Sequence, residues 1–173
     1  AIAYARALRE TGNSAQAVSV LETTLRTSKK FDELEIQTRA ALSRAYLANQ
    51  QLNEARAVLV PLQGKTEALL PLARSLNEIL TQTNDLSIAD SVANLYRQAL
   101  AQNPDPDPKL LREVADVFVG LPQGQTFALQ IYRQLVASNP NDRSLFVKQL
   151  TLESKLGLIS RPELRARLAQ AVQ

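Results

Sequence analysis

Side chains able to do chemistry are scarce in this sequence, and the two most versatile types are absent. Its 173 residues include no His and no Cys. Without imidazole or thiol groups there is no Ser-His-Asp triad, no thiol nucleophile, no imidazole general base and no zinc site of the usual ligands. We therefore expect a chain that is not an enzyme, with no catalytic residues, no cofactor and no metal ion.

Two short motifs resemble ligand-binding loops but lack their requirements. Residues 64–66, Gly-Lys-Thr, match the end of a phosphate-binding loop, yet the Gly needed five residues earlier is replaced by Leu59. We interpret this segment as a turn between helices. Asp105 and Asp107 alternate with prolines, but a calcium site needs more oxygen ligands and usually a Gly. This segment is predicted to be a rigid linker that ends in a helix cap.

Composition favours an all-α protein with a mild charge. The chain is 45% apolar, rich in strong helix formers, and only 5% aromatic. Its net charge is +3, with nine basic and six acidic residues in 1–66 and eleven of each thereafter. Nucleic acids require a concentrated basic stripe, so we expect no nucleic-acid partner. Apolar runs are far shorter than the roughly 18 residues of a membrane span, so we expect no membrane insertion.

The ends of the chain leave its cellular location undetermined. The sequence has no Met, and a helical pattern begins at residue 1 without a cap or a signal-peptide pattern. We therefore expect a fragment of a longer protein. The absence of Cys fits both the cytoplasm and the periplasm.

An internal repeat organises the chain. Residues 95–104, Leu-Tyr-Arg-Gln-Ala-Leu-Ala-Gln-Asn-Pro, are echoed 36 residues later by 131–140, Ile-Tyr-Arg-Gln-Leu-Val-Ala-Ser-Asn-Pro. A weaker echo at a spacing of 38 matches Ala17, Val20 and Leu21 with Ala55, Val58 and Leu59. Repeats of this length are typical of helical hairpins that stack on one another.

Apolar spacing at a period of 3.6 residues predicts ten helices, paired into five antiparallel hairpins. Asp32 with Glu35, Asp107 before Pro108, and Ser160 with Glu163 are predicted N-terminal caps. Pro61 predicts an early stop or a kink in the fourth helix. The expected helices span roughly 1–11, 14–28, 32–49, 53–63, 67–83, 86–102, 108–119, 124–138, 142–156 and 161–172.

This pattern resembles the tetratricopeptide repeat (TPR) family, in a divergent, bacterial-type form. The matching positions are Leu8, Gly12, Ala17 and Leu21; Leu42, Tyr46, Ala55 and Leu59; Tyr96, Ala99 and Pro104; and Ala128, Tyr132 and Pro140. The resemblance implies one domain, a right-handed superhelix (α-solenoid), with repeats at about 1–31, 32–66, 67–107, 108–141 and 142–173. Tyr96 and Tyr132 are expected to be core residues, and the helix bearing Arg161, Arg165 and Arg167 is expected to cap the stack.

The family lines a concave groove with the first helix of each pair. In that register the groove-facing residues are Arg6, Arg9, Gln37, Arg44, Leu47, Arg74, Asn77 and Thr81. Repeated arginines would present forked donors to the carboxylates of an extended peptide or of an acidic polysaccharide. The alternative is a solvated face on which Glu10, Glu35 or Glu54 pairs with these arginines. The Lys and Asn of the family's carboxylate clamp are replaced by Ile2 and Arg6.

Three functions follow from the resemblance. The first is a non-catalytic scaffold that binds a protein or peptide partner in the groove. The second is a TPR segment of a bacterial cell-envelope export protein of the cellulose synthase operon protein C type, which handles exopolysaccharide. The third is an RNA-binding helical repeat, although the charge-neutral second half of the chain argues against this function.

Overall fold

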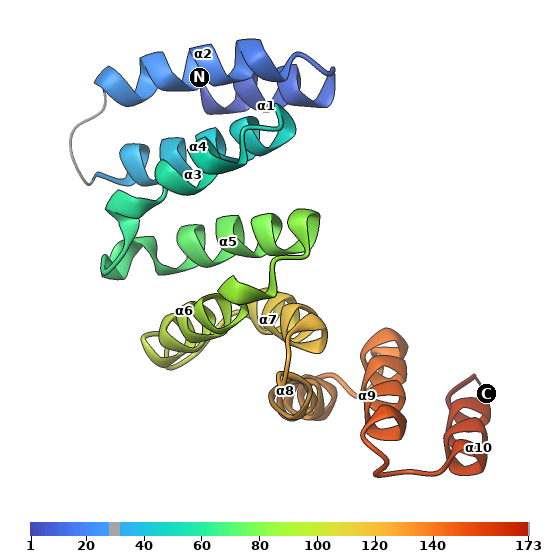
Figure 1. Cartoon of the computed structure of the whole chain (residues 1–173). Helices are drawn as coiled ribbons and strands as arrows, with labels where there is room; N and C mark the ends of the chain where they lie inside the picture. Colours follow the sequence, from blue (N-terminus) through green and yellow to red (C-terminus); the bar gives the residue numbers. More distant parts are fainter. Residues whose placement is uncertain (28–31, 173) are drawn as a thin grey trace. The chain divides into compact units, whose positions relative to one another are not determined.

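Helices are the regular elements of this protein. The computed structural model describes residues 1–27 and 32–172, with side chains described up to residue 169, and no strand occurs in those ranges (Figure 1). Contacts group the chain into two compact units, Ala1–Gln102 and Asn103–Gln173. The boundary falls at the end of the predicted third repeat, where the proline-rich segment begins. The single-domain organisation stays a prediction.

Unit 1 consists of three helical hairpins that stack through their first helices. Helix α3 contacts both helices of the preceding hairpin, its own partner α4, and α5, while α5 packs on α6 (Figure 1). Short 3-10 turns, named η1 to η3, interrupt the later hairpins. The elements are α1 Ile2–Glu10, α2 Ser14–Thr27, α3 Glu33–Ala48, α4 Leu52–Ala57, η1 Val60–Leu62, η2 Thr66–Ala68, α5 Leu69–Thr83, η3 Leu86–Ile88 and α6 Ala89–Ala101.

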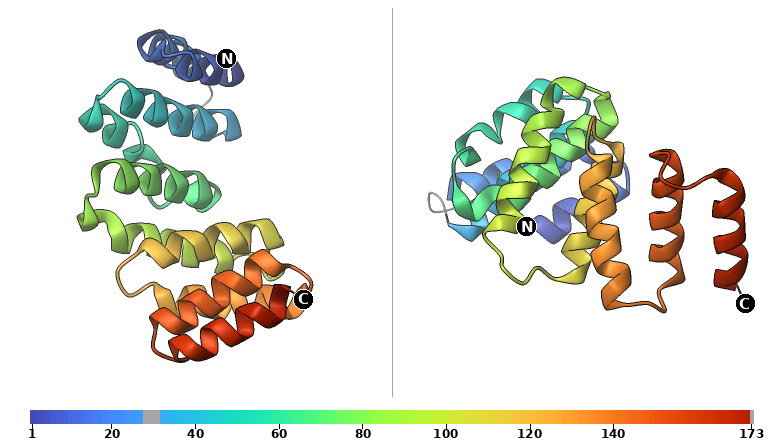
Figure 2. Two further views of the ribbon diagram at one scale, coloured as in Figure 1. Left: turned by 90° about the vertical axis from the view of Figure 1, so that its right-hand side faces the viewer. Right: turned by 90° about the horizontal axis from the view of Figure 1, so that it is seen from below.

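Unit 2 contains two hairpins. Its helices are α7 Pro108–Gly120, α8 Gln125–Ser138, α9 Arg143–Lys155 and α10 Arg161–Val172. Each packs on the next one along the chain, and α9 and α10 lie antiparallel side by side (Figure 2). The ten predicted helices are therefore confirmed, with their boundaries shifted by a few residues.

The largest departure from the predicted boundaries is in the fourth helix, and Pro61 explains it. The prediction of 53–63 is too long, because α4 ends at Ala57 and Pro61 lies in η1. Proline has no N–H to continue the helical hydrogen bonds, so the chain tightens into a 3-10 turn. The Arg39 guanidinium then donates to the carbonyl of Val58 over 3.1 Å. An acceptor left at the helix end is thereby satisfied from α3.

The predicted caps are present. Asp32 accepts a hydrogen bond from the Glu35 backbone N–H at 2.7 Å, and Asp107 accepts one from Lys109 at 2.7 Å, with Pro108 in the first turn. The Ser160 hydroxyl oxygen accepts from the Glu163 N–H at 3.3 Å. These side chains satisfy backbone donors that the first helical turn leaves unpaired.

One turn of unit 2 has room only for glycine. Gly124 is the N-cap residue of α8, and a Cβ there would lie 2.3 Å from the carbonyl oxygen of Phe118. Phe118 is fully buried, and the centre of its ring lies 4.7 Å from that of Phe127 with the two ring planes tilted by 52°. The small residue thus lets the start of α8 approach the end of α7 closely.

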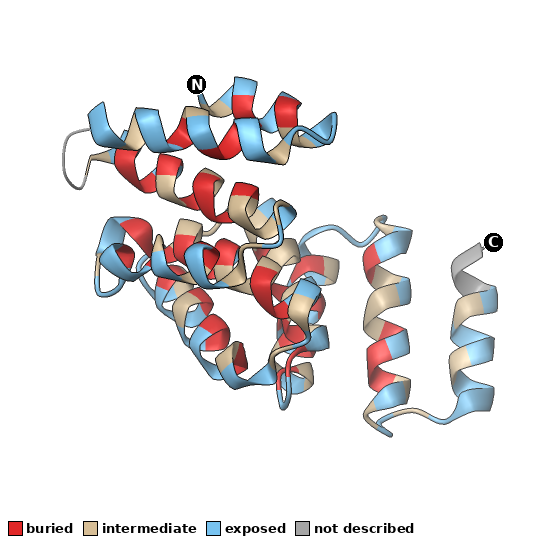
Figure 3. Ribbon diagram, turned by 45° about the horizontal axis from the view of Figure 1, so that its top comes forward, coloured by how far each residue is buried: buried red, intermediate tan, exposed pale blue. Residues whose placement is uncertain are grey.

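Apolar residues on the facing sides of the helices form the core (Figure 3). Tyr96 and Tyr132 are almost fully buried, which confirms their predicted packing role. The outermost helix differs, because no described side chain of α10 is buried and Leu164 and Leu168 are half-buried. Arg161, Arg165 and Arg167 are exposed, as suits a helix that covers α9 with a polar outer face.

Candidate functional site

Three of the predicted groove residues come together in unit 1. Arg6 and Arg9 on α1 and Arg44 on α3 border a hollow of about 170 Å³. We call this hollow the arginine cleft. Its other lining residues are apolar: Ile2, Ala5, Leu21 and Ala41. The contact between α1 and α3 therefore turns arginines 35 to 38 positions apart into one cationic site.

The three arginines differ in their partners. Arg6 is exposed, with an ion pair to Glu10 at 2.9 Å inside α1. Arg44 is 30% exposed and pairs with Glu78 of α5, also at 2.9 Å. Within the described ranges, the half-buried side chain of Arg9 has no ion-pair partner. Arg9 is therefore the guanidinium most available to an incoming anion.

The expected alternative pairings are only partly correct. Glu10 does pair with Arg6, but the carboxylate that pairs with Arg44 is Glu78 and not Glu35 or Glu54. Glu35 is buried and pairs with Arg39 at 2.7 Å. Sequence reasoning missed Glu78, although it lies 34 residues after Arg44, close to one repeat length.

The other five predicted residues do not line the arginine cleft. Gln37 donates to Glu33 at 2.9 Å along its own helix, and Leu47 packs against the core of unit 1. On α5, Arg74 and Thr81 are exposed and Asn77 is half-buried. The Thr81 hydroxyl donates to the Asn77 carbonyl at 2.8 Å and thus is satisfied within its helix.

Unit 2 contains a larger hollow that sequence reasoning did not identify. We call it the valine pocket; its volume is about 390 Å³ and it lies between α7 and α9. The lining residues are Asp116, Val119, Tyr132, Val147, Lys148, Thr151, Leu152 and Lys155. Val147 is 42% exposed at its surface. A concave surface lined by aliphatic side chains with a few polar groups is common among ligand-binding sites.

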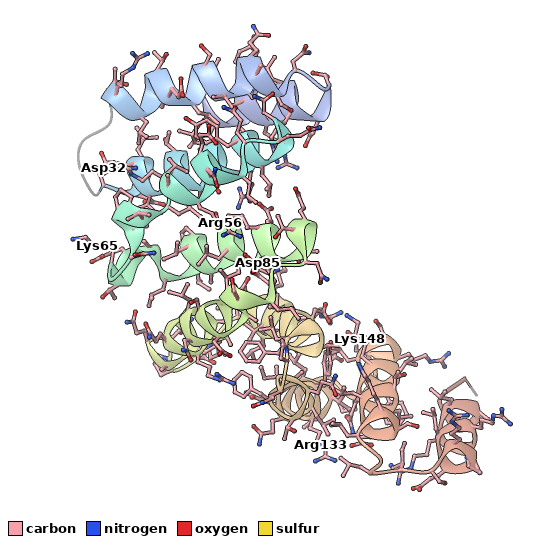
Figure 4. The ribbon with its side chains drawn as sticks, viewed as in Figure 1. Asp32, Arg56, Lys65, Asp85, Arg133 and Lys148 are labelled. Carbon is pink, nitrogen blue, oxygen red and sulfur yellow. The ribbon has the colours of Figure 1, made fainter. Side chains whose placement is uncertain are left out.

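A polar cluster holds one wall of the valine pocket. The Lys148 ammonium, labelled in Figure 4, binds the two oxygens of Asp116 at 2.6 and 2.8 Å and lies 5.9 Å from the centre of the Tyr132 ring. The Tyr132 hydroxyl also donates to Asp116. Burial and this hydrogen bond raise the pKa of Tyr132 above its usual range, so the phenol stays protonated.

The sequence does contain a signal for this cluster, which is the spacing between its oppositely charged residues. Lys148 follows Asp116 by 32 residues, much as Glu78 follows Arg44 by 34. Oppositely charged residues about one repeat apart lie on neighbouring first helices in both units. Applied to 108–155, the same rule would have pointed to the valine pocket.

Across residues 1–27 and 32–172, no three His, Cys, Asp or Glu side chains gather where they would hold a metal ion. No helix in the same ranges is long and apolar enough to cross a membrane. Residues 63–65 join η1 to η2 through Gly64, whose φ is +74°, and Thr66 is the first residue of η2. They form a turn, as predicted.

Comparison with known proteins identifies the fold. No protein-family model and no curated protein matches the chain. Two solved structures of the nearly identical TPR-like repeats of a putative kinesin light chain from Podosopora anserina are similar to it. Each aligns with a TM-score of 0.72 and 19% identity, covering 98% of this chain and 90% of the other. The helical hairpins therefore have a TPR-like repeat fold.

Proposed function

We propose that this chain, an all-helical protein of the TPR-like repeat type, is a non-catalytic scaffold that binds a carboxylate-bearing peptide segment of a partner protein in the arginine cleft. The fold supports the general role, because TPR-like repeats generally mediate protein–protein interaction. The chemistry of the segment follows from the cleft itself. Three guanidinium groups surround one apolar hollow, and two nearby carboxylates balance only part of their charge.

Arg9 is the observation on which this proposal depends most. A guanidinium presents several N–H donors in a planar fork that matches a carboxylate. Arg6 and Arg44 already donate to glutamates, whereas Arg9 has no ion-pair partner among the described residues. A glutamate or aspartate side chain of the peptide would form an ion pair with Arg9. It would also compete with Glu10 for Arg6 and with Glu78 for Arg44. Its aliphatic stem would lie on Ile2 and Ala41.

The two alternatives from the sequence require different ligands. An envelope export scaffold would bind an acidic polysaccharide, and an RNA-binding repeat would bind single-stranded RNA. Neither ligand is favoured by the cleft, because aromatic side chains on which bases or sugars stack are missing from its lining. Both ligands are useful competitors in a binding assay.

The test uses the full chain and a fluorescein-labelled peptide with three glutamates alternating with serines. Fluorescence anisotropy of the wild type is compared with that of Arg9→Glu and of Arg26→Glu. Arg26 is exposed on α2 and provides the matched change of charge outside the cleft. We expect Arg9→Glu to weaken peptide binding at least about tenfold, since a close charge pair becomes repulsive. Arg26→Glu should weaken it less than about twofold.

Three results would contradict the proposal. Equal weakening by the two variants would indicate attraction by net charge alone. Stronger binding of oligouridine or of an alginate oligosaccharide than of the peptide would support one of the alternatives. Absence of saturable peptide binding by a wild type with native helical circular dichroism would exclude the cleft as an acidic-peptide site.

A further inference from the structure

We infer that the valine pocket of unit 2 is a second peptide site, which binds an extended segment carrying an aliphatic residue and, two positions away, a carboxylate. The inference goes beyond the proposed function, because none of the pocket's residues belongs to the arginine cleft or to unit 1. It rests on the size and lining of the pocket, on the charges at its ends, and on the exposure of Val147.

The pocket has the dimensions of a short extended peptide. Val147, Thr151 and Lys155 follow one another along a single face of α9 at intervals of four residues. Eight residues of helix span about 12 Å. An extended chain advances about 3.3 Å per residue, so roughly four residues fit along the pocket. Alternate side chains of such a segment point to the same side, which places two of them against α9.

The middle of the pocket is suited to an aliphatic side chain. Val119, Val147 and Leu152 contribute apolar groups from α7 and α9. The Thr151 hydroxyl donates to the Val147 carbonyl at 2.8 Å, so it is already satisfied within the helix. Covering a half-exposed valine with a leucine side chain removes apolar surface from water and stabilises the complex. The pocket needs no rearrangement, because the Lys148–Asp116–Tyr132 cluster already holds one wall.

The charge at one end of the pocket selects the second side chain. Lys148 is neutralised by Asp116, whereas Lys155 has no ion-pair partner in the part of the chain that the structure describes. The site therefore has one positive charge available for a carboxylate. Lys155 is the last residue of α9. Its positive charge offsets the partial negative charge of the carbonyl groups at this end of the helix, which would repel an anion. The N–H groups of Gly157 and Leu158 bond to the carbonyls of Ser154 and Glu153, which reduces that repulsion.

The experiment is an amide NMR titration of the ¹⁵N-labelled full chain with end-blocked pentapeptides. The main probe is Ser-Leu-Ser-Glu-Ser, and two matched probes replace Glu with Gln or Leu with Ser. Hexanoate is the fourth probe, because it combines an aliphatic chain with a carboxylate without a peptide backbone. We expect saturable shifts of amides in 116–119 and 147–155 with the main probe, and at least about threefold weaker binding of both matched peptides.

Four variants locate the site. Lys155→Glu should weaken the main probe at least about threefold and leave the Gln peptide unaffected, since an exposed ion pair is lost. Lys109→Glu makes the same change of charge on α7 outside the pocket and should have no effect. Val147→Ser should weaken both Leu-containing peptides. Leu158→Ser, at an exposed leucine outside the pocket, is its control.

The inference is overturned if the shifts lie outside the pocket or do not saturate, or if Lys109→Glu and Lys155→Glu weaken binding equally. Equal or tighter binding of hexanoate would overturn the assignment to a peptide. Arg9→Glu, which alters the arginine cleft, should leave the titration of the pocket unchanged. Failure of the pocket is thereby distinguished from failure of the proposed function.

Discussion

The arginine cleft of unit 1 and the valine pocket of unit 2 are built from the same element and differ in chemistry. Each lies between the first helices of neighbouring hairpins, α1 with α3 and α7 with α9. The cleft is the smaller hollow and is bordered by three arginines, whereas the pocket is larger and is lined by Val119, Val147 and Leu152. Neighbouring hairpins thus leave a hollow between their first helices in both units, while a few side chains on those helices set the chemistry of the hollow.

In both units an ion pair links the first helices of neighbouring hairpins, but the order of the two charges along the chain is reversed. In unit 1 the cation, Arg44, is on the earlier helix and the anion, Glu78, is on the later one. In unit 2 the anion, Asp116, comes first and the cation, Lys148, follows. An ion pair of either polarity links neighbouring hairpins, so the fold does not constrain which of the two first helices carries the cation.

The largest expected effect concerns the two buried glutamates, one in each unit. Arg39→Ala removes an ion pair to the buried Glu35 from a side chain that is 18% exposed, together with the hydrogen bond to the Val58 carbonyl, and should cost about 3 kcal/mol of unfolding free energy. Arg133→Ala should cost about 1 kcal/mol, because Arg133 is 53% exposed and Glu153 retains Gln149 at 3.1 Å. Urea unfolding followed by circular dichroism measures both values. Equal losses of unfolding free energy in the two variants would contradict the predicted difference between these ion pairs.

A smaller effect is expected on ligand affinity when the carboxylate that pairs with Arg44 or with Lys148 is neutralised. Glu78→Gln frees Arg44, and should tighten binding of the glutamate peptide to the cleft by about twofold to fivefold. Asp116→Asn frees Lys148 in the same way and should tighten binding of the Leu-Glu peptide to the pocket. Each substitution should leave the other site unchanged. Paired anisotropy and NMR titrations check this, and a loss of affinity at the freed site would contradict the electrostatic account.

Much of this fold could be predicted because local signals agree with it. The caps at Asp32 and Asp107 and the proline at 61 fix helix ends through backbone hydrogen bonds that the sequence makes explicit. The grouping of Arg6, Arg9 and Arg44 was accessible from the repeat register. The polar wall of the valine pocket was accessible in the same way, from the spacing of Asp116 and Lys148, whereas the size of the pocket depends on how far apart α7 and α9 lie. Hydrophobic periodicity does not contain that distance.

The smallest expected effect is a pH dependence at a cap of unit 1. Hydrogen bonds from Ser87, and then the Arg56 guanidinium, lower the pKa of Asp85 to about 2; Figure 4 shows Arg56 and Asp85 side by side. Because the folded pKa lies below the unfolded value, this contribution is present above about pH 4 and is lost as the pH falls towards 2. Asp85→Asn should therefore lose less stability than the wild type over that interval.

Comparison of urea midpoints at about pH 5 and about pH 2.5 measures this difference. In unit 2 Asp142 caps α9, and its pKa is lowered chiefly by its hydrogen bond from Arg112 at 2.7 Å. Asp142→Asn should change the pH dependence in the same direction. The prediction would be contradicted if the urea midpoints of the wild type and of both variants fell by the same amount between the two pH values.

The most direct test of the account maps the glutamate peptide onto the labelled full chain by amide NMR. We expect saturable shifts concentrated in residues 2–10 and 37–48, on the two helices that border the arginine cleft, and we expect these shifts to be lost in Arg9→Glu. Saturable shifts concentrated elsewhere, or shifts that persist unchanged in Arg9→Glu, would contradict the claim that these arginines bind the partner.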